Sequence, residues 1–292
     1  MANTVVYNKH DYVARMRARM NRPTSFMDTM NVKYRNARTI VEGAMTTEAS
    51  VQTGTRGTAY GFSDFTITAD TLTISTKQII PIFVDQADLT QQSYVTQMQL
   101  ADFQGKKISE HLESAVLGQH TNWTNFGQGD LDNTSPDDTT QITVSATNID
   151  DIFRAVKRKV YANNGVDFSV EKGVFCVWRP SDFELLESYV QANGFTEADI
   201  ALKNGIPVQK GFYYGGMNHY LSNDHTANHL FAGVRKMGDL GILSSTFGQV
   251  KFLEDPSNGD GNLSGLGIVS RVDYGFSWAT YYNEFFMDIN VV

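Results

Sequence analysis

The chain has 292 residues, of which 41 % are hydrophobic and 12 % aromatic, enough to bury a substantial core. Its net charge of −8 excludes a general nucleic-acid coat, because affinity for phosphates requires clustered lysine and arginine. The single cysteine, Cys176, excludes an internal disulfide, and the absence of a long apolar run or an apolar leader argues against a membrane span and a signal peptide. We therefore expect a globular protein made in a reducing, intracellular compartment, with no membrane partner.

Residues 1 to 43 form a basic segment. It contains eight lysines and arginines against three acids, about +5, which leaves the remainder of the chain near −13. Three of the arginines are evenly spaced: Arg15, Arg17 and Arg19. Such a group either contacts phosphate or pairs with acids of a neighbouring chain, and both interpretations stay open. We interpret the segment as an arm.

The arm is predicted to contain one short helix. Apolar side chains fall at helical spacing near residues 9 to 21, and Pro23 ends the pattern. Beyond it, apolar residues such as Phe26 and Tyr34 follow no clear period. A segment of this kind seldom forms a core of its own, so we expect it to lie against another surface.

A loop and a hairpin follow the arm. Residues 43 to 61 are rich in glycine, threonine and serine, which is typical of a mobile loop. Three residues mark its tip: Gly54, Arg56 and Gly57. Alternating apolar residues on both sides of Ala69-Asp70 predict a β-hairpin that turns there. The apolar run from Ile79 to Val84 predicts a further strand.

The most regular element is a long helix over residues 88 to 118. Asp88 is a suitable N-cap, and Gly118 stands where a left-handed C-terminal glycine is expected. Small or apolar side chains at spacings of four and three form one stripe: Tyr94, Met98, Ala101, Gly105, Ile108, Leu112 and Ala115. Gly105 costs about 1 kcal/mol relative to alanine, so we expect either a bend or the close passage of another backbone at this position.

The second half of the chain alternates helices and strands. Residues 119 to 140 are rich in acids and turn formers and predict an exposed excursion that closes on a strand at 141 to 144. Residues 148 to 204 predict helix, strand, helix, helix, a compact α/β unit. The remainder predicts β-strands, including two long strands within 268 to 292 that break near Gly275.

No residue pattern indicates an active site. The sequence lacks a phosphate-binding loop, a dinucleotide fingerprint, a nucleophile elbow and a zinc-protease motif. The nearest approach to a metal cluster is a group of histidines whose spacing fits no common zinc pattern: His219, His225 and His229. An acidic group could take up a cation but is more simply a solvated face: Asp130, Asp132, Asp137 and Asp138. We expect no cofactor and no metal, with Cys176 in the core.

The order of these parts resembles the major capsid proteins of tailed bacteriophages, which have the Hong Kong 97-like or Johnson fold. Two consecutive segments resemble the family's extended-loop return, peripheral strand and spine helix: TITADTLTISTKQIIPIFVDQADLTQQ and SYVTQMQLADFQGKKISEHLESAVLG. Two others are similar to its axial domain: WRPSDFELL and LKNGIPVQKG. The resemblance covers nearly the whole chain.

The resemblance implies an α+β fold of five parts. These are an N-terminal arm (1–43), an extended loop with a β-hairpin (44–80), a peripheral domain (81–147) with the spine helix 88–118, an axial domain (148–265) and C-terminal strands that return to the peripheral domain (266–292). The arm would then contact neighbouring subunits through Arg15, Arg17, Arg19, Phe26 and Tyr34. The implied function is that of a major capsid protein whose hexamers and pentamers form an icosahedral head.

Further expectations follow from the resemblance. The head would enclose double-stranded DNA, held by non-specific charge, and would assemble in the host cytoplasm before becoming the virion. Because no acidic or coiled-coil segment precedes the arm in this sequence, we expect scaffolding to be either separate or unnecessary if Met1 is the true start, with portal and decoration proteins as further candidate partners. The family's covalent cross-link needs a loop lysine, which residues 50 to 61 lack, so that chemistry is not expected.

Two alternatives remain open. The first is the shell of an encapsulin-type nanocompartment, which would enclose a cargo enzyme in place of a genome. The second is a hydrolase-like enzyme with a site around Trp178, Asp182 and His219, although these residues lack the spacing of a paired acid and base.

Overall fold

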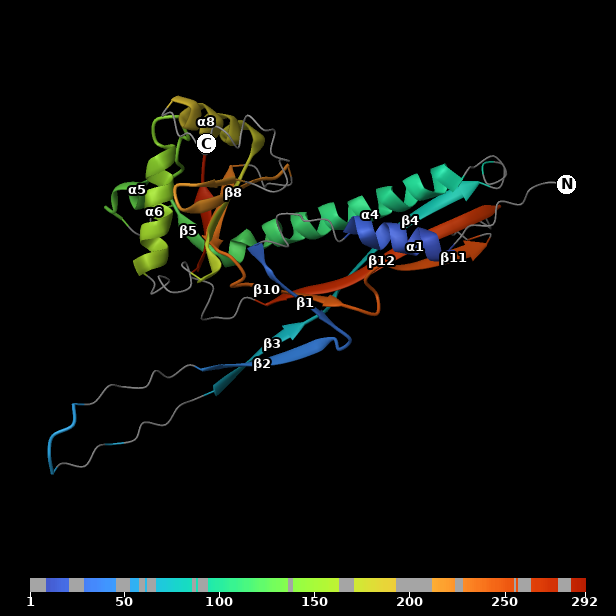
Figure 1. Ribbon diagram of the computed structural model, residues 1–292, viewed down its shortest axis with the longest axis horizontal. Helices are drawn as coiled ribbons and strands as arrows, with labels where there is room; N and C mark the ends of the chain where they lie inside the picture. The colour runs from blue at the N-terminus through green and yellow to red at the C-terminus, as the bar shows by residue number, and fades with distance from the viewer. Residues whose placement is uncertain are drawn as a thin grey trace.

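A computed structural model of the chain describes residues 9–20, 29–45, 53–57, 61, 67–85, 88, 94–135, 139–162, 171–192, 212–223, 228–254, 256, 264–277 and 285–292. The molecule is elongated, with two lobes joined by the long helix α4 (Tyr94–Leu117), and a hairpin projects from its middle (Figure 1). None of the described helices is long and apolar enough to cross a bilayer.

A five-stranded sheet forms the flatter lobe. Its central strand is β12 (Gly265–Ser277), which pairs along one edge with β4 (Thr76–Asp85). The other edge of β12 pairs first with β11 (Gln249–Glu254) and then with β10 (Asp239–Leu243), and β1 (Asn31–Arg35) runs parallel to β10. Most residues of β12 are buried, as expected of a strand with partners on both edges.

A six-stranded sheet forms the thicker lobe. Its order is β5 (Thr124–Phe126), β13 (Phe286–Asn290), β9 (His229–Val234), β6 (Val174–Trp178), β8 (Met217–Leu221) and β7 (Phe212–Tyr214). Every residue of β6 is buried, as its unbroken apolar run predicts. Helices α6 (Ile149–Ala162) and α8 (Pro180–Ala192) complete this lobe (Figure 1).

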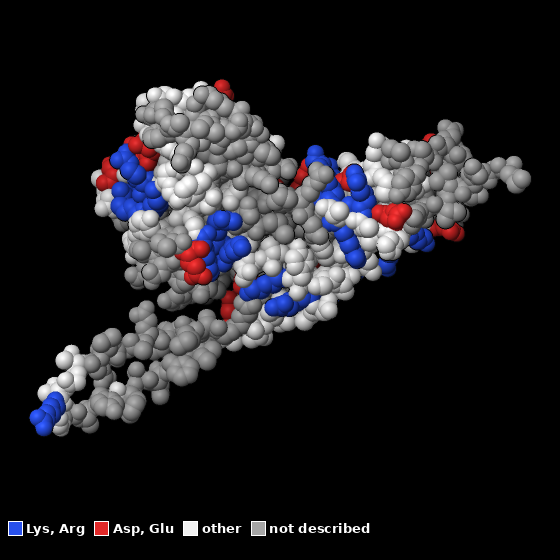
Figure 2. All heavy atoms as spheres, viewed as in Figure 1, with Lys and Arg blue, Asp and Glu red and all other residues white. Residues whose placement is uncertain are grey.

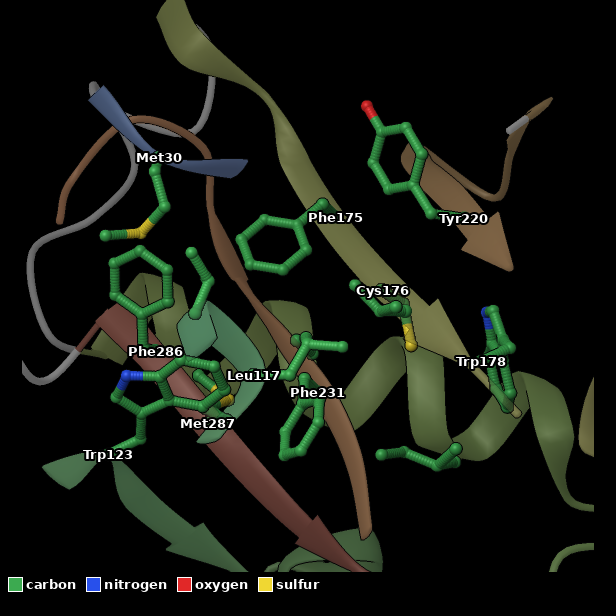
Figure 3. Close-up of a cluster of buried hydrophobic side chains, with 14 of the residues drawn as sticks. Met30, Leu117, Trp123, Phe175, Cys176, Trp178, Tyr220, Phe231, Phe286 and Met287 are labelled. Carbon is green, nitrogen blue, oxygen red and sulfur yellow. The ribbon is translucent and has the colours of Figure 1, made fainter. Parts of the chain in front are cut away.

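One hydrophobic core connects the end of α4 with the six-stranded sheet. Figure 3 shows Leu117 of α4, Trp123, Phe231 of β9 and Phe286 of β13 converging beside Phe175 of β6. The rings of Trp123 and Phe231 meet edge to face at 5.1 Å. After Leu117 the chain continues directly into the 3-10 helix η1 (Gly118–Asn122), so the long helix is fixed at this end by the sheet it enters.

The projecting hairpin consists of β2 (Thr39–Met45) and β3 (Ile67–Thr73). The two strands are antiparallel, with Thr39 opposite Thr73 and Met45 opposite Ile67. The predicted turn at Ala69-Asp70 is therefore wrong, because β3 runs straight through both residues. Alternation alone does not identify a turn, and the true partner lies at the end of the arm, where the sequence shows no clear period.

Several other predicted elements differ from the structure. Gly118 does not adopt the left-handed conformation expected of a helix cap, because the chain passes into η1 without a reversal. β12 is unbroken at Gly275. The strand predicted at 141 to 144 is reduced to one bridge, between Ile142 and Val291. The helix α4 begins at Tyr94, and residues 89–93 of the predicted helix lie outside the described residues.

Sheet membership also differs from the expected part boundaries. β10 and β11 belong to the sheet of β4 and β12, although they fall within the segment expected to be axial. β13 pairs with β9 and β5 in the other sheet, although it was expected to return to the peripheral part. The chain crosses between the lobes twice after β9, and such long-range pairing leaves no local signal in the sequence.

Candidate functional site

The arm helix α1 (Lys9–Met20) packs along the middle of α4. Its apolar side chains Tyr12, Met16 and Met20 are buried in the chain's own core. The surface that covers α1 therefore belongs to the same chain, whereas the family resemblance implied a neighbouring subunit. The three residues lie at i, i+4 and i+8, so they share the face of α1 that meets α4.

Gln104 of α4 connects three elements below this contact. Its Oε1 accepts a hydrogen bond from the Tyr12 hydroxyl at 2.9 Å. Its Nε2 donates to the carbonyl oxygens of Ile80 in β4 and Ile268 in β12, both at 3.2 Å. The side chain is fully buried. Gln104 was not predicted as a site residue, although it lies next to the apolar stripe, where a polar residue needs buried partners.

Gly105 marks the closest approach of α1 and α4. A Cβ added at this position would lie 2.6 Å from the carbonyl oxygen of Met16 and 2.8 Å from the Cβ of Arg19. Real side chains do not reach such distances, so the two backbones can be this close only with glycine at position 105. Of the two explanations predicted from the sequence, close passage of another backbone is therefore present, and the passing element is a helix.

The three arm arginines contact the chain's own surface. Arg15 pairs with Asp102 of α4 through two hydrogen bonds of 2.9 and 2.8 Å. The side chain of Arg17 lies against Gly248 and that of Arg19 against Gly105. Asp102 therefore supplies a carboxylate to Arg15 within the chain, and contact of the arm arginines with phosphate or with a neighbouring chain's acids stays a prediction.

The remaining predicted arm and spine residues lie as follows. Tyr34 on β1 packs edge to face on Phe247, with ring centroids 5.2 Å apart. On α4 itself, Met98 is partly buried, and Ile108 and Leu112 are almost completely buried. Phe26 lies outside the described residues, as does the side chain of Tyr94.

The root of the hairpin crosses the five-stranded sheet over a pair of glycines. Gly241 on β10 and Gly275 on β12 are directly opposite each other. A Cβ at Gly275 would lie 2.0 Å from the carbonyl oxygen of Thr73, and one at Gly241 would lie 2.7 Å from the Leu72 side chain. The hydroxyl of Ser277 also donates to Asp70 at 3.0 Å. These contacts set the direction in which β2 and β3 leave the body.

The tip of the hairpin extends far from the rest of the chain. Residues 53–57 are exposed, and they lie at the far end of the projection in Figure 1. A Cβ added at Gly54 or Gly57 would meet no atom within 4 Å other than those of its chain neighbours, and Gly57 has a positive φ of 87°. Arg56 supplies the basic group visible at the tip in Figure 2. The described residues therefore leave these tip positions uncovered.

The acidic excursion is attached to α6. Asp130 is buried and accepts a hydrogen bond from Lys159 at 3.0 Å and from the backbone N–H of Gly127 at 2.8 Å. The prediction of a solvated face is therefore wrong for Asp130, because the basic face of α6 supplies its partner. Asp132 accepts a hydrogen bond from the hydroxyl of Thr134 at 2.7 Å, and Asp137 and Asp138 lie outside the described residues.

Of the histidines predicted as the nearest metal group, the two that the structure describes, His219 and His229, lie on different strands. His219 is buried on β8, His229 begins β9 in a different part of the sheet, and His225 lies outside the described residues. His229 instead meets His120 and Asp288, which sequence spacing could not indicate because 59 and 168 residues separate the hydrogen-bonded pairs.

His219 also lacks the geometry of a catalytic base. Trp178 donates its indole N–H to Nδ1 of His219 at 2.9 Å, so the ring proton is on Nε2, which donates to the carbonyl oxygen of Tyr214 at 3.0 Å. Asp182 pairs with Arg179 at 2.6 Å. Both imidazole nitrogens are therefore occupied, and the three residues considered for a hydrolase-like site do not form an acid and base pair.

The buried imidazole predicts acid sensitivity. Burial lowers the pKa of His219 from 6.5 to about 4, so below pH 6.5 the unfolded chain takes up a proton that the folded chain resists. This stability is complete above pH 6.5 and is lost as the pH falls toward 4, by about 3 kcal/mol. Urea unfolding near neutral and acid pH should show a shallower pH dependence for His219→Asn than for wild type. His10→Asn changes an exposed histidine, and its pH dependence should match that of wild type. If all three proteins showed the same pH dependence of the free energy of unfolding, His219 could not be the cause of the acid sensitivity.

Comparison with solved structures identifies the fold. No protein-family model matches the chain, and no curated protein matches it in sequence. Among solved structures, a chain of Mycobacterium phage Che8 has a TM-score of 0.66 at 13 % identity, with 91 % of each chain covered. A chain of the capsid of cyanophage P-SCSP1u has a TM-score of 0.62 at 12 % identity and covers 92 % of this chain and 88 % of its own. A chain of the virus-like particle from Pyrococcus furiosus has a TM-score of 0.58 at 11 % identity, and the match covers 98 % of this chain and 100 % of that one.

These matches, with the two sheets, the long helix and the projecting hairpin, define a shell-protein fold of the mixed α and β class. More particularly, the chain has the Hong Kong 97-like fold of tailed-phage major capsid proteins, and the fold class predicted from the sequence is confirmed.

Proposed function

We propose that the protein is the major capsid protein of a tailed bacteriophage, a structural subunit without enzymatic activity. The observation that carries this proposal is the hairpin β2–β3, whose tip at 53–57 extends into solvent from a body of the capsid fold. A two-stranded hairpin is marginally stable in water by itself. It would gain stability by lying on another copy of the chain, which favours self-assembly.

The assembly that fits this contact is a ring. A hairpin that binds a different surface of the next copy makes a heterologous contact, and such contacts close into rings when the rotation allows. We infer hexameric and pentameric capsomers that close into an icosahedral head around double-stranded DNA. Scaffolding, portal and decoration proteins would act as separate partners, and the shell would form in the host cytoplasm and become the virion capsid.

The residue assignments follow the same proposal. The tip residues Gly54, Arg56 and Gly57 would contact a neighbouring subunit, and so would the parts of the arm that α4 leaves uncovered. Arg15, whose charge is compensated by Asp102, would contribute less to DNA binding than the other arm cations. The spine stripe would serve as the rigid connection between the two lobes.

Imaging of the purified full chain tests this function. We expect closed shells or capsomer rings in negative stain, and we expect a variant with residues 53–57 replaced by a two-residue turn to stay folded but to form neither. The control is Arg56→Lys, which keeps the charge and length of the tip. A stable wild-type monomer at high concentration, or normal shells from the shortened hairpin, would contradict the proposal.

A second candidate is the shell of an encapsulin-type nanocompartment. It is favoured by the structural match to the virus-like particle from Pyrococcus furiosus, which extends over 98 % of this chain and 100 % of the particle's chain. The two candidates differ in content: a phage head holds nuclease-resistant DNA, whereas a nanocompartment holds protein cargo. Shells isolated from the native source and treated with nuclease distinguish them.

A further inference from the structure

Two histidines and one aspartate converge at the joint between the spine helix and the six-stranded sheet. His120 lies on η1, directly after α4, His229 begins β9, and Asp288 lies in the middle of β13. The three residues come from segments far apart in the sequence. They lie beside the aromatic core, because His120 and Trp123 both pack on Phe231, at centroid distances of 5.6 and 5.1 Å.

The two imidazoles face the same carboxylate. Nδ1 of His120 lies 2.9 Å from Oδ2 of Asp288, and Nδ1 of His229 lies 2.8 Å from Oδ1. The ring centroids are 4.5 Å apart. Asp288 is buried, whereas the side chains of His120 and His229 are 14 % and 24 % exposed. The group is therefore enclosed on the sheet side and open to solvent on the other.

Asp288 differs from the other buried aspartates of the described chain in the kind of side chain that it faces. Asp130 pairs with Lys159, Asp182 with Arg179, and Asp273 with Arg271. Among the described residues, Asp288 has two imidazoles in the corresponding position and neither lysine nor arginine as an ion-pair partner. A buried carboxylate needs a compensating charge, which lysine or arginine supplies at the other three sites. At Asp288 the corresponding positions hold two side chains that are themselves metal-binding groups.

We propose that His120, His229 and Asp288 bind a divalent transition-metal ion of the Zn²⁺ type. Two imidazole nitrogens and one carboxylate are a common ligand set for such ions, with a water molecule in the remaining position. The ligand atoms of the three residues lie within 4.8 Å of one another. Around a tetrahedral ion with bonds of about 2.1 Å, ligand atoms lie about 3.4 Å apart. The two contacts of 2.9 and 2.8 Å would therefore lengthen by about half an ångström, and wider separations within the group would shorten by up to about 1.4 Å.

The surroundings allow this adjustment. His120 lies in a 3-10 helix of five residues, and His229 is the first residue of β9 and follows Asn228, which has a positive φ of 64°. Each imidazole would coordinate the ion through Nδ1, with its ring proton on Nε2. The bound ion would connect the end of α4 to β9 and β13, and thereby hold the long helix to the six-stranded sheet.

Metal titration of the full chain tests this site. After removal of adventitious metal, Zn²⁺ should bind one per chain and raise the Tm by about 5 °C at saturating concentration, because it binds only the folded state. Co²⁺ should give the intense visible absorption of a four-coordinate ion. His120→Asn and His229→Asn keep an amide donor for Asp288 but remove an imidazole, and each should weaken binding at least about tenfold.

The matched control is His111→Asn. His111 is a partly buried histidine on α4 whose Nε2 lies 2.9 Å from the Tyr274 hydroxyl, away from the proposed site, and its variant should bind Zn²⁺ as wild type does. X-ray absorption of the wild-type Zn²⁺ complex provides a measurement independent of variant folding, and should show two imidazoles around the ion. Absence of stoichiometric binding, or a first shell without imidazole, would overturn the proposal and leave a hydrogen-bonded triad.

Discussion

Gly105→Ala is expected to lower the free energy of unfolding by about 1 to 2 kcal/mol, although alanine is the better helix former. Alanine in place of glycine inside a helix gains about 1 kcal/mol. The new methyl group would lie 2.6 Å from the Met16 carbonyl and 2.8 Å from the Arg19 Cβ, which forces α1 away from α4. Such overpacking costs about 1 to 3 kcal/mol, and the separation also disturbs the buried Tyr12–Gln104 hydrogen bond.

Gly118→Ala is the matched control for this substitution. Gly118 follows the same helix, has no positive φ, and has no atom within 4 Å of an added Cβ. Its variant should therefore be as stable as wild type or slightly more stable. Limited trypsin digestion adds a specific readout, since a displaced α1 would be cut at its arginines sooner than in wild type. A Gly105→Ala protein that is more stable than wild type, with α1 equally protected, would show that α1 and α4 do not meet as described.

The sequence predicted those elements whose signal is local. The stripe on α4 and the apolar run of β6 repeat over neighbouring residues, so periodicity identified both. The strands β1 and β2 were missed because their partners, β10 and β3, are supplied by other parts of the chain. Pairing partners decide whether such half-exposed segments become strands, and no pattern within five to seven residues contains that information.

The residues of the candidate site also differ in whether a local sequence signal could predict their contacts. A glycine on an otherwise regular stripe predicted a bend or the close passage of another backbone at position 105, but only the structure identified α1 as the passing element. The pairing of Arg15 with Asp102, and the meeting of His120 with His229, depend on contacts between distant segments. Charge counting could show that the arm is basic, yet not that part of its charge is compensated within the chain.

Gly275→Ala is expected to have a larger effect than any other glycine to alanine change proposed for this chain, a loss of about 3 kcal/mol with failure of shell assembly. The added Cβ would lie 2.0 Å from the carbonyl oxygen of Thr73 and 3.0 Å from the Cα of Ile74. Both obstacles are backbone atoms, which cannot rotate away, so β3 must lift from the sheet. The hairpin would then leave the body in a different direction, and its tip would miss the surface we propose for it on the next subunit.

Gly241→Ala provides a graded comparison at the same crossing, because Gly241 is the cross-strand partner of Gly275. Its nearest obstacles are side-chain atoms of Leu72 and Ile74, which can change rotamer, so the expected loss is only about 1 kcal/mol. Gly54→Ala at the open tip should be neutral for folding. Urea unfolding gives the order, and negative stain gives the assembly. If Gly241→Ala and Gly275→Ala were equally stable and both built normal shells, the backbone of β3 could not lie across β12 at Gly275, and the direction of the hairpin would have to be set elsewhere.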